Sequence, residues 1–190
     1  MIIQKKGAGA LSFGTWRKSA VLFLVFVSFA VSGGALAVEF GKTEAISVKA
    51  LMALKIKNPA MRGIARTVQG MIESLNKQDV RALSKFYVPD ASAVFFGAAQ
   101  ARKAIGIKTF MELQDQCLGA FKTVSVEPGD MQVKSFGKLA VATLTGRNNN
   151  VFLSGEKSVT EWRWTLVLRN MGGNNWQVAH EHLSVEALPQ

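Results

Sequence analysis

The chain has 190 residues, of which 48% are hydrophobic, with 23 basic and 13 acidic side chains. This length is enough for one domain with a substantial hydrophobic core but short for two. Because Cys117 is the only cysteine, an internal disulfide is excluded.

Residues 1–37 have the three-part pattern of a secretory signal peptide. Four basic residues and no acidic one precede an apolar run over residues 20–31, and the small-x-small sequence Ala35-Leu36-Ala37 follows. The run is shorter than the about 20 residues that span a bilayer as a helix. We therefore expect an exported protein, periplasmic or secreted, without stable membrane association after cleavage; an uncleaved anchor is the alternative.

Removal of this segment leaves 19 basic and 13 acidic side chains on residues 38–190, a net charge of +6. These charges are scattered along the chain and form no basic run. A nucleic-acid interface would require a concentrated basic face. The sequence thus predicts a mildly basic, solvated surface and no nucleic-acid partner.

The first half of the mature chain is predicted to be helical. Residues 38–58 are a lead-in with a possible helix over 44–57. Apolar residues then recur at steps of three and four from Met61 to Leu75, which places them on one face of a helix. Asp79 is suited to cap a second, short helix that ends before Pro89. Residues 91–96 indicate a strand, 97–104 a loop, and 105–119 a third helix.

The second half is rich in Val, Thr, Phe and Trp, which favour strands. Strands are expected over residues 121–127, 131–136, 139–147, 151–169 and 176–188, with turns at 128–130, 136–138, 148–150 and 171–174. Helices followed by an antiparallel meander predict an α+β fold in which the helices pack on one face of a curved sheet.

Two segments resemble the SnoaL-like group of the NTF2-like superfamily. The first is the passage over residues 75–91, which includes Asp79, Tyr87 and Asp90; the second is the closing pair, RWTLVLR at 163–169 and WQVAHEHLS at 176–184. The resemblance covers residues 60–188, and we assign 59–190 to this domain. It implies a cone in which a curved antiparallel sheet wraps the helices around a pocket, and it implies a homodimer.

Ketosteroid isomerases share this fold, but their chemistry does not fit the sequence. The position of the isomerase general base is Phe95 here, and that of the oxyanion-hole tyrosine is Met71. Enolisation needs a base and a hydrogen-bond donor, which these side chains do not provide. The steroid-isomerase mechanism is therefore excluded.

The closing strand carries the candidate catalytic residues Glu181, His180 and His182. Strict alternation places both histidines on one face, with Trp176 and Val178, and Glu181 on the other. A resemblance to the calmodulin-kinase association domain implies that Glu181 and Leu183 face the pocket, with Arg163 and Thr165 beside them. We expect a pocket of Arg163, Thr165, Glu181, Tyr87 and Phe95.

Other features of the sequence lead to further expectations. The His-x-His pair has no third ligand at a recognisable spacing, so neither a metal nor another cofactor is expected. Trp162, Trp164 and Leu166 form an apolar strip that is either core or a dimer surface. Six phenylalanines predict a largely apolar cavity: Phe95, Phe96, Phe110, Phe121, Phe136 and Phe152.

Two functions remain open. One is a module that binds a small apolar molecule without turnover. The other is a lyase, isomerase or cyclase that uses Glu181 or a histidine as base and Arg163 to hold an anionic group.

Overall fold

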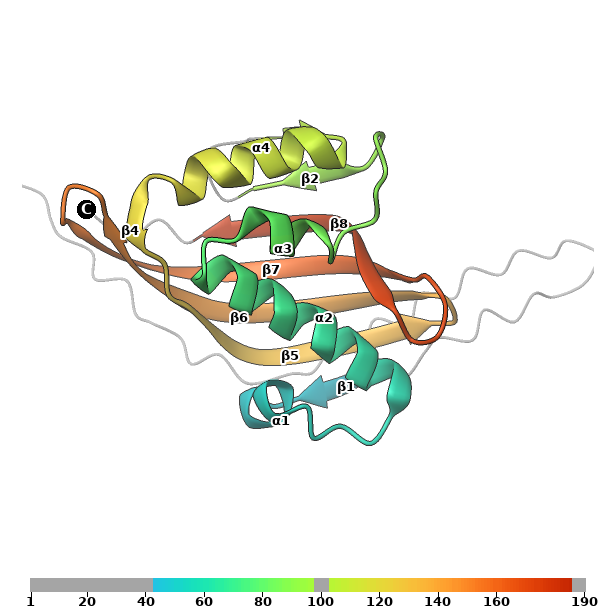
Figure 1. The fold of residues 1–190 in the computed structure, drawn as a ribbon. Coiled ribbons are helices and arrows are strands. Elements are labelled where there is room, and N and C mark those ends of the chain that lie inside the picture. The colour runs from blue at the N-terminus through green and yellow to red at the C-terminus, as the bar shows by residue number, and fades with distance from the viewer. Residues whose placement is uncertain (1–42, 98–102, 186–190) are drawn as a thin grey trace, which may run out of the picture. The chain divides into compact units, whose positions relative to one another are not determined.

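The computed structural model describes residues 43–97 and 103–185. Four helices and eight strands occur in this part of the chain (Figure 1). In chain order they are β1 (Thr43–Ile46), α1 (Val48–Ala53), α2 (Pro59–Asn76), α3 (Val80–Ser84), β2 (Val94–Phe96), β3 (Lys103–Ile105), α4 (Ile107–Leu118), β4 (Phe121–Thr123), β5 (Val126–Phe136), β6 (Leu139–Phe152), β7 (Lys157–Asn170) and β8 (Trp176–Val185).

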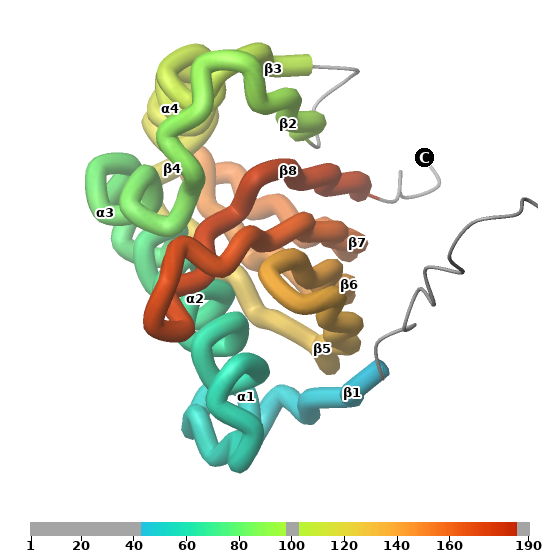
Figure 2. The backbone as a smooth tube through the Cα atoms, turned by 90° about the vertical axis from the view of Figure 1, so that its right-hand side faces the viewer, coloured from blue at the N-terminus to red at the C-terminus, as the bar shows by residue number. Residues whose placement is uncertain are grey.

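The strands form one sheet in the order β1-β5-β6-β7-β8-β2-β3, with β4 paired to β6. All neighbours are antiparallel except β2 and β8, which run parallel. Figure 2 shows the helices gathered on one side of strands β5 to β8. The predicted α+β fold with helices on one face of a curved sheet is therefore confirmed. We call the face that meets the helices the inner face.

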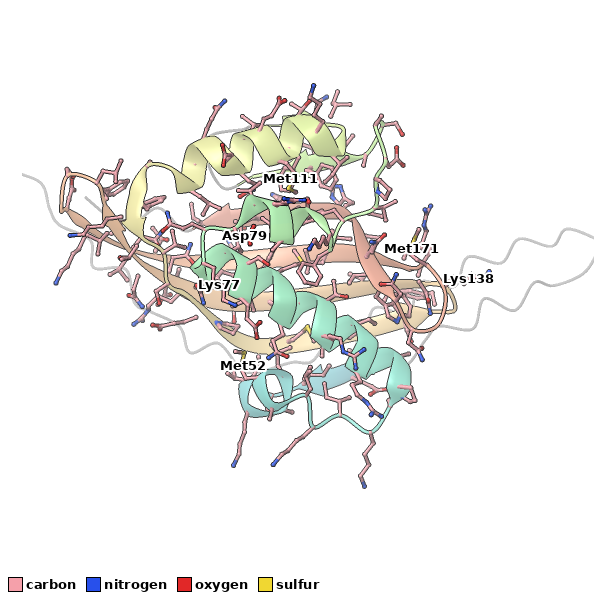
Figure 3. All side chains as sticks on the ribbon, in the orientation of Figure 1. Met52, Lys77, Asp79, Met111, Lys138 and Met171 are labelled. Atoms are coloured by element: carbon pink, nitrogen blue, oxygen red, sulfur yellow. The ribbon has the colours of Figure 1, made fainter. Side chains whose placement is uncertain are left out.

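Helix α2 begins and ends where its sequence predicts. The Asn58 side chain accepts hydrogen bonds from the backbone N–H groups of Ala60 and Met61, and Pro59 supplies the first helical residue. The periodic apolar residues of α2 are buried under the sheet. Asp79 likewise caps α3, since its Oδ1 accepts from the Ala82 N–H at 2.8 Å. Figure 3 shows Lys77 and Asp79 at this junction of the two helices.

Several local predictions are wrong. The turn expected at 128–130 is an irregularity within β5, which runs on to Phe136, and residues 103–105, expected to be the end of a loop and the start of a helix, form β3. The lead-in is not one helix over 44–57, because Thr43–Ile46 pairs with β5 and the helix begins only after Ser47, which caps it. Residues 148–150 are not a turn, because β6 runs through them to Phe152 and the chain turns at 153–156. Asparagine favours turns, but here the side chains of Asn148 and Asn150 accept hydrogen bonds that tie them into the sheet.

A β-bulge in β8 changes which side chains face the helices. Val167 pairs with His180 and Leu168 pairs with Val178, so Ala179 is an extra residue without a partner in β7. The alternation shifts by one position there. Trp176 and Val178 before the bulge, and Glu181 and Leu183 after it, consequently share the inner face, whereas both histidines lie on the outer face. The expectation that the histidines share a face with Trp176 and Val178 is wrong.

Gly146 in β6 makes room for the ring of Trp162. A Cβ atom on Gly146 would overlap that ring and would lie 2.5 Å from the Glu127 carbonyl oxygen. The backbone of Glu127 cannot move aside as a flexible side chain can. We expect Gly146→Ala to lower the free energy of unfolding by about 1–3 kcal/mol, measured by urea denaturation.

Gly97→Ala is the matched control, because no described atom lies within 4 Å of a Cβ built there. This variant should stay within about 0.5 kcal/mol of the native chain. If the two variants were equally stable, close packing of Trp162 against Gly146 would not matter for the fold.

No helix of the described residues is long and apolar enough to cross a membrane. The predicted signal peptide, residues 1–37, lies outside the described residues, as do the first residues of the lead-in.

Candidate functional site

A cavity of about 220 Å³ lies between the inner face of the sheet and helices α2, α3 and α4. Its walls are mainly apolar side chains: Leu75, Leu83, Leu118, Phe121, Val124, Val126, Leu183 and Val185. Three larger aromatic side chains, those of Tyr87, Trp162 and Trp164, complete the walls. Small-molecule sites are typically concave and apolar with a few placed polar groups, which is the composition found here.

Glu181 is the only acidic side chain that lines this cavity in the part of the chain that is described. Its side chain is 2% exposed. Oε2 accepts two hydrogen bonds, one from the Tyr87 hydroxyl at 2.5 Å and one from the Trp164 indole N–H at 3.3 Å. Oε1 receives no hydrogen bond from the described residues. The carboxyl group is thus held by one oxygen, and the other remains available at the cavity.

Burial raises the pKa of Glu181 from its ordinary value of 4.5 to about 7. The hydrogen bonds from Tyr87 and Trp164 oppose this rise, since each stabilises the ionised form, but desolvation is the larger effect. Burial also raises the pKa of the Tyr87 phenol, which the negative charge of Glu181 raises further. The phenol therefore stays protonated and donates, while the carboxyl group changes its charge near neutral pH.

Tyr87 is fixed by its neighbours on three elements. Its backbone forms a bridge to Val178 of β8. Its ring packs against Phe95 of β2 and Phe110 of α4, with centroid distances of 5.7 Å and 5.4 Å. Phe95 lies directly beside Glu181 across the parallel β2–β8 pair, but it does not reach the cavity wall. Phe95 thus helps to hold Tyr87 in contact with Glu181 without lining the cavity itself.

The structure separates Arg163 and Thr165 from Glu181. Trp164 lies on the inner face, so its two neighbours in β7 point to the outer face. Arg163 is exposed and lines an open surface hollow beside the Arg147–Glu161 ion pair. The hypothesis that Arg163 and Thr165 stand beside Glu181 in the pocket is therefore wrong.

The two histidines also lie on the outer face. The Nδ1–H of His180 donates to the Val94 carbonyl oxygen at 2.6 Å, and His182 is exposed. Both rings contact Phe96 edge-on. Neither histidine lines the cavity. No group of three potential metal ligands occurs among residues 43–97 and 103–185.

The apolar strip of β7 belongs to the interior. Trp162, Trp164 and Leu166 are 3%, 4% and 0% exposed. All three pack in the core under the helices, and the two tryptophans also form part of the cavity wall, so this strip is not a dimer surface. Of the six phenylalanines expected to line the cavity, Phe121 alone does so; the tryptophans supply the aromatic wall instead.

A family model described as a SnoaL-like domain matches residues 64–187. The chain belongs to this family. The match includes every residue of the cavity wall, from Leu75 to Val185. A comparison with curated proteins found no match.

Solved structures agree with this assignment. The SnoaL-like domain is similar to an NTF2-like superfamily protein from Salmonella enterica, with 17% identity, a TM-score of 0.60, and coverage of 69% of this chain and 94% of that one. An NTF2-like protein of unknown function from Pseudomonas putida is 25% identical, with a TM-score of 0.55 and coverage of 64% and 82%. A proposed scytalone dehydratase from Novosphingobium aromaticivorans is 12% identical, with a TM-score of 0.60 and coverage of 67% and 84%.

Proposed function

We propose that this SnoaL-like domain binds a small, largely apolar molecule in the cavity and that Glu181 anchors a polar group of that molecule. The observation that carries the proposal is a single buried carboxyl group in a mainly apolar cavity, held by Tyr87 and Trp164 through one oxygen only. The volume of about 220 Å³ is below the roughly 300–1,000 Å³ of sites for drug-sized ligands. A small ligand is therefore the best fit.

Desolvation explains why such an anchor would be effective. A buried polar group without its full set of partners is costly, so a ligand that supplies the missing hydrogen bond to Oε1 gains that free energy on binding. An ionised Glu181 would accept from a hydroxyl or amine of the ligand, and a protonated Glu181 would donate to a carbonyl. With a pKa of about 7, both forms are accessible near neutral pH.

A lyase or isomerase that uses Glu181 as base is the second candidate. A general base works best when its pKa lies near the operating pH, and burial brings Glu181 into that range. The histidines and Arg163 lie on the outer face and do not support this role. Catalysis by Glu181 would show a rate that rises with pH around 7 and is lost in Glu181→Gln.

Replacement of Glu181 by Gln tests the proposal, because Gln keeps the shape of the side chain and removes its charge. We expect Glu181→Gln to weaken binding of a small phenol such as 4-ethylphenol by tenfold or more at about pH 8. A hydrogen bond to a charged group contributes about 1.5–3 kcal/mol, and 1.4 kcal/mol corresponds to a factor of ten. Binding is measured by isothermal titration calorimetry.

His182→Gln is the matched control, since it changes a neighbouring side chain on the outer face. It should bind as the native chain does. Equal affinities of Glu181→Gln and the native chain, for a ligand located in the cavity by NMR contacts to Leu183, would contradict the role of Glu181 as anchor.

Export of the mature chain and its homodimerisation remain predictions. A dimer that forms through the sheet would use the outer face, where Arg163, His180 and His182 lie, because the tryptophan strip is covered by the helices of its own chain.

A further inference from the structure

Besides Gln114 of α4, four uncharged polar side chains of β6 and β7 line the cavity away from Glu181. Asn148 and Asn150 lie near the end of β6, and Thr160 and Ser158 are their direct partners in β7. We call these four residues the outer polar group. They are half-buried, so a ligand in the cavity can reach them.

The outer polar group presents hydrogen-bond donors. The Oδ1 atom of Asn148 accepts from the Trp162 indole N–H at 2.9 Å, and the Oδ1 atom of Asn150 accepts from the Ser125 backbone N–H at 3.2 Å. These bonds fix the orientation of both amides, because the amide nitrogen cannot accept. The amide N–H groups have no acceptor among the described residues, so they remain available to a ligand. The hydroxyls of Ser158 and Thr160 can donate as well.

The aromatic side chains of Trp162 and Trp164 lie between the outer polar group and Glu181 along β7. Trp164 contacts Glu181, Trp162 lies two residues earlier in β7 on the same face, and Thr160 lies two residues before Trp162. Residues four apart on an extended strand are about 13–14 Å apart. The cavity therefore has an acceptor at its inner end, an apolar middle, and donors at its outer end.

We propose that the ligand is a small hydroxy acid with a rigid apolar body, whose hydroxyl group binds Glu181 and whose carboxylate binds the outer polar group. The ionised carboxyl group of Glu181 accepts from a hydroxyl through Oε1. The amide and hydroxyl donors at the other end complement an acceptor-rich carboxylate, and no acidic side chain of the described cavity wall lies there to repel it. This inference rests on the proposed function and specifies the ligand class of the same cavity.

Three probes separate the two ends of the cavity. The probe 3-(4-hydroxyphenyl)propionic acid has both groups, 4-ethylphenol lacks the carboxylate, and 3-phenylpropionic acid lacks the hydroxyl. We expect the native chain at about pH 8 to bind the first at least tenfold more tightly than either of the others, measured by calorimetry.

Asn148→Asp is the decisive variant. An aspartate keeps the shape and the acceptor for Trp162 but replaces the amide donor by an oxygen with negative charge. It should weaken binding of the hydroxy acid by tenfold or more and leave 4-ethylphenol within twofold. Thr160→Val, which keeps the shape and removes a donor, should change binding in the same direction by a smaller factor. Ser184→Ala, on the outer face opposite Arg163 in β7, is the control.

The outcomes separate this inference from the proposed function. If 4-ethylphenol binds in a Glu181-dependent way but the carboxylate adds no affinity, or if Asn148→Asp weakens both probes equally, the hydroxy-acid inference is overturned and the anchor role of Glu181 stands. If binding of all three probes is absent or independent of Glu181, both are overturned.

Discussion

Raising the pH from about 4 to about 8 should lower the stability of the native chain relative to Glu181→Gln by on the order of 3 kcal/mol. The buried carboxyl group has a pKa of about 7, against 4.5 when it is in water. Between these values the folded state binds more protons than the unfolded state, so the free energy of unfolding falls as the pH rises. The stabilisation is complete below about pH 4.5 and is lost as the pH passes 7.

Urea denaturation of both chains at a series of pH values measures this difference. The comparison with Glu181→Gln is necessary because other carboxyl groups act in the opposite direction; hydrogen bonds from Ser92 lower the pKa of Asp90, for example. The difference between the two stability curves isolates Glu181. Parallel curves would mean that the carboxyl group is solvated or ionised at all these pH values, which would contradict the closed inner end of the cavity.

Trp164→Ala should lower the free energy of unfolding by about 3–5 kcal/mol, the range found when a large aromatic side chain is removed from a core. Trp164 is 4% exposed and packs edge-on against Trp162 at a centroid distance of 6.0 Å. Its removal also takes one of the two hydrogen-bond donors from Glu181. Chemical denaturation gives the change.

Two neighbouring substitutions test the reason for this loss. Trp164→Phe keeps an aromatic ring and removes only the N–H group, so it should cost less. Thr165→Ala changes the next residue, which points to the outer face, and should stay within about 0.5 kcal/mol. A loss below about 1 kcal/mol for Trp164→Ala would indicate that the strip of β7 is not part of the core.

The sequence predicts the fold well because its helices and hairpins are encoded locally. The apolar period from Met61 to Leu75 and the cap Asp79 act over a few residues, and each appears in the structure as expected. The lead-in fails for the opposite reason. Thr43–Ile46 becomes a strand only by pairing with β5, about 90 residues later in the chain, and such a contact leaves no local signal.

The candidate site could be predicted only in part. The sequence predicts Glu181 and Tyr87 as single site residues, but their mutual hydrogen bond depends on the bridge between Tyr87 and Val178 of β8, which are far apart in the chain. The resemblance to the calmodulin-kinase association domain predicts the wrong face for Arg163 and Thr165. The alternation of β7, with Trp162 and Trp164 in the interior, indicates instead that both point away from the pocket.

The sequence does not predict the outer polar group, because a run of asparagines is typical of a turn. Asn148 and Asn150 alternate on one face of β6, which is the period of a strand, and this spacing was the available signal. Their pairing with Thr160 and Ser158 depends on the length of the β6–β7 hairpin, which the misplaced turn concealed.

The extra residue in β8 divides that strand into two parts with different neighbours. Before Ala179, Trp176 and Val178 hold the sheet against α2, and Thr67 of α2 donates to the Trp176 carbonyl oxygen at 2.6 Å. After it, Glu181 and Leu183 form the wall of the cavity. Because the bulge resets the alternation between them, side chains of both parts face the helices. One extra residue thus lets a single strand both hold a helix and line a cavity.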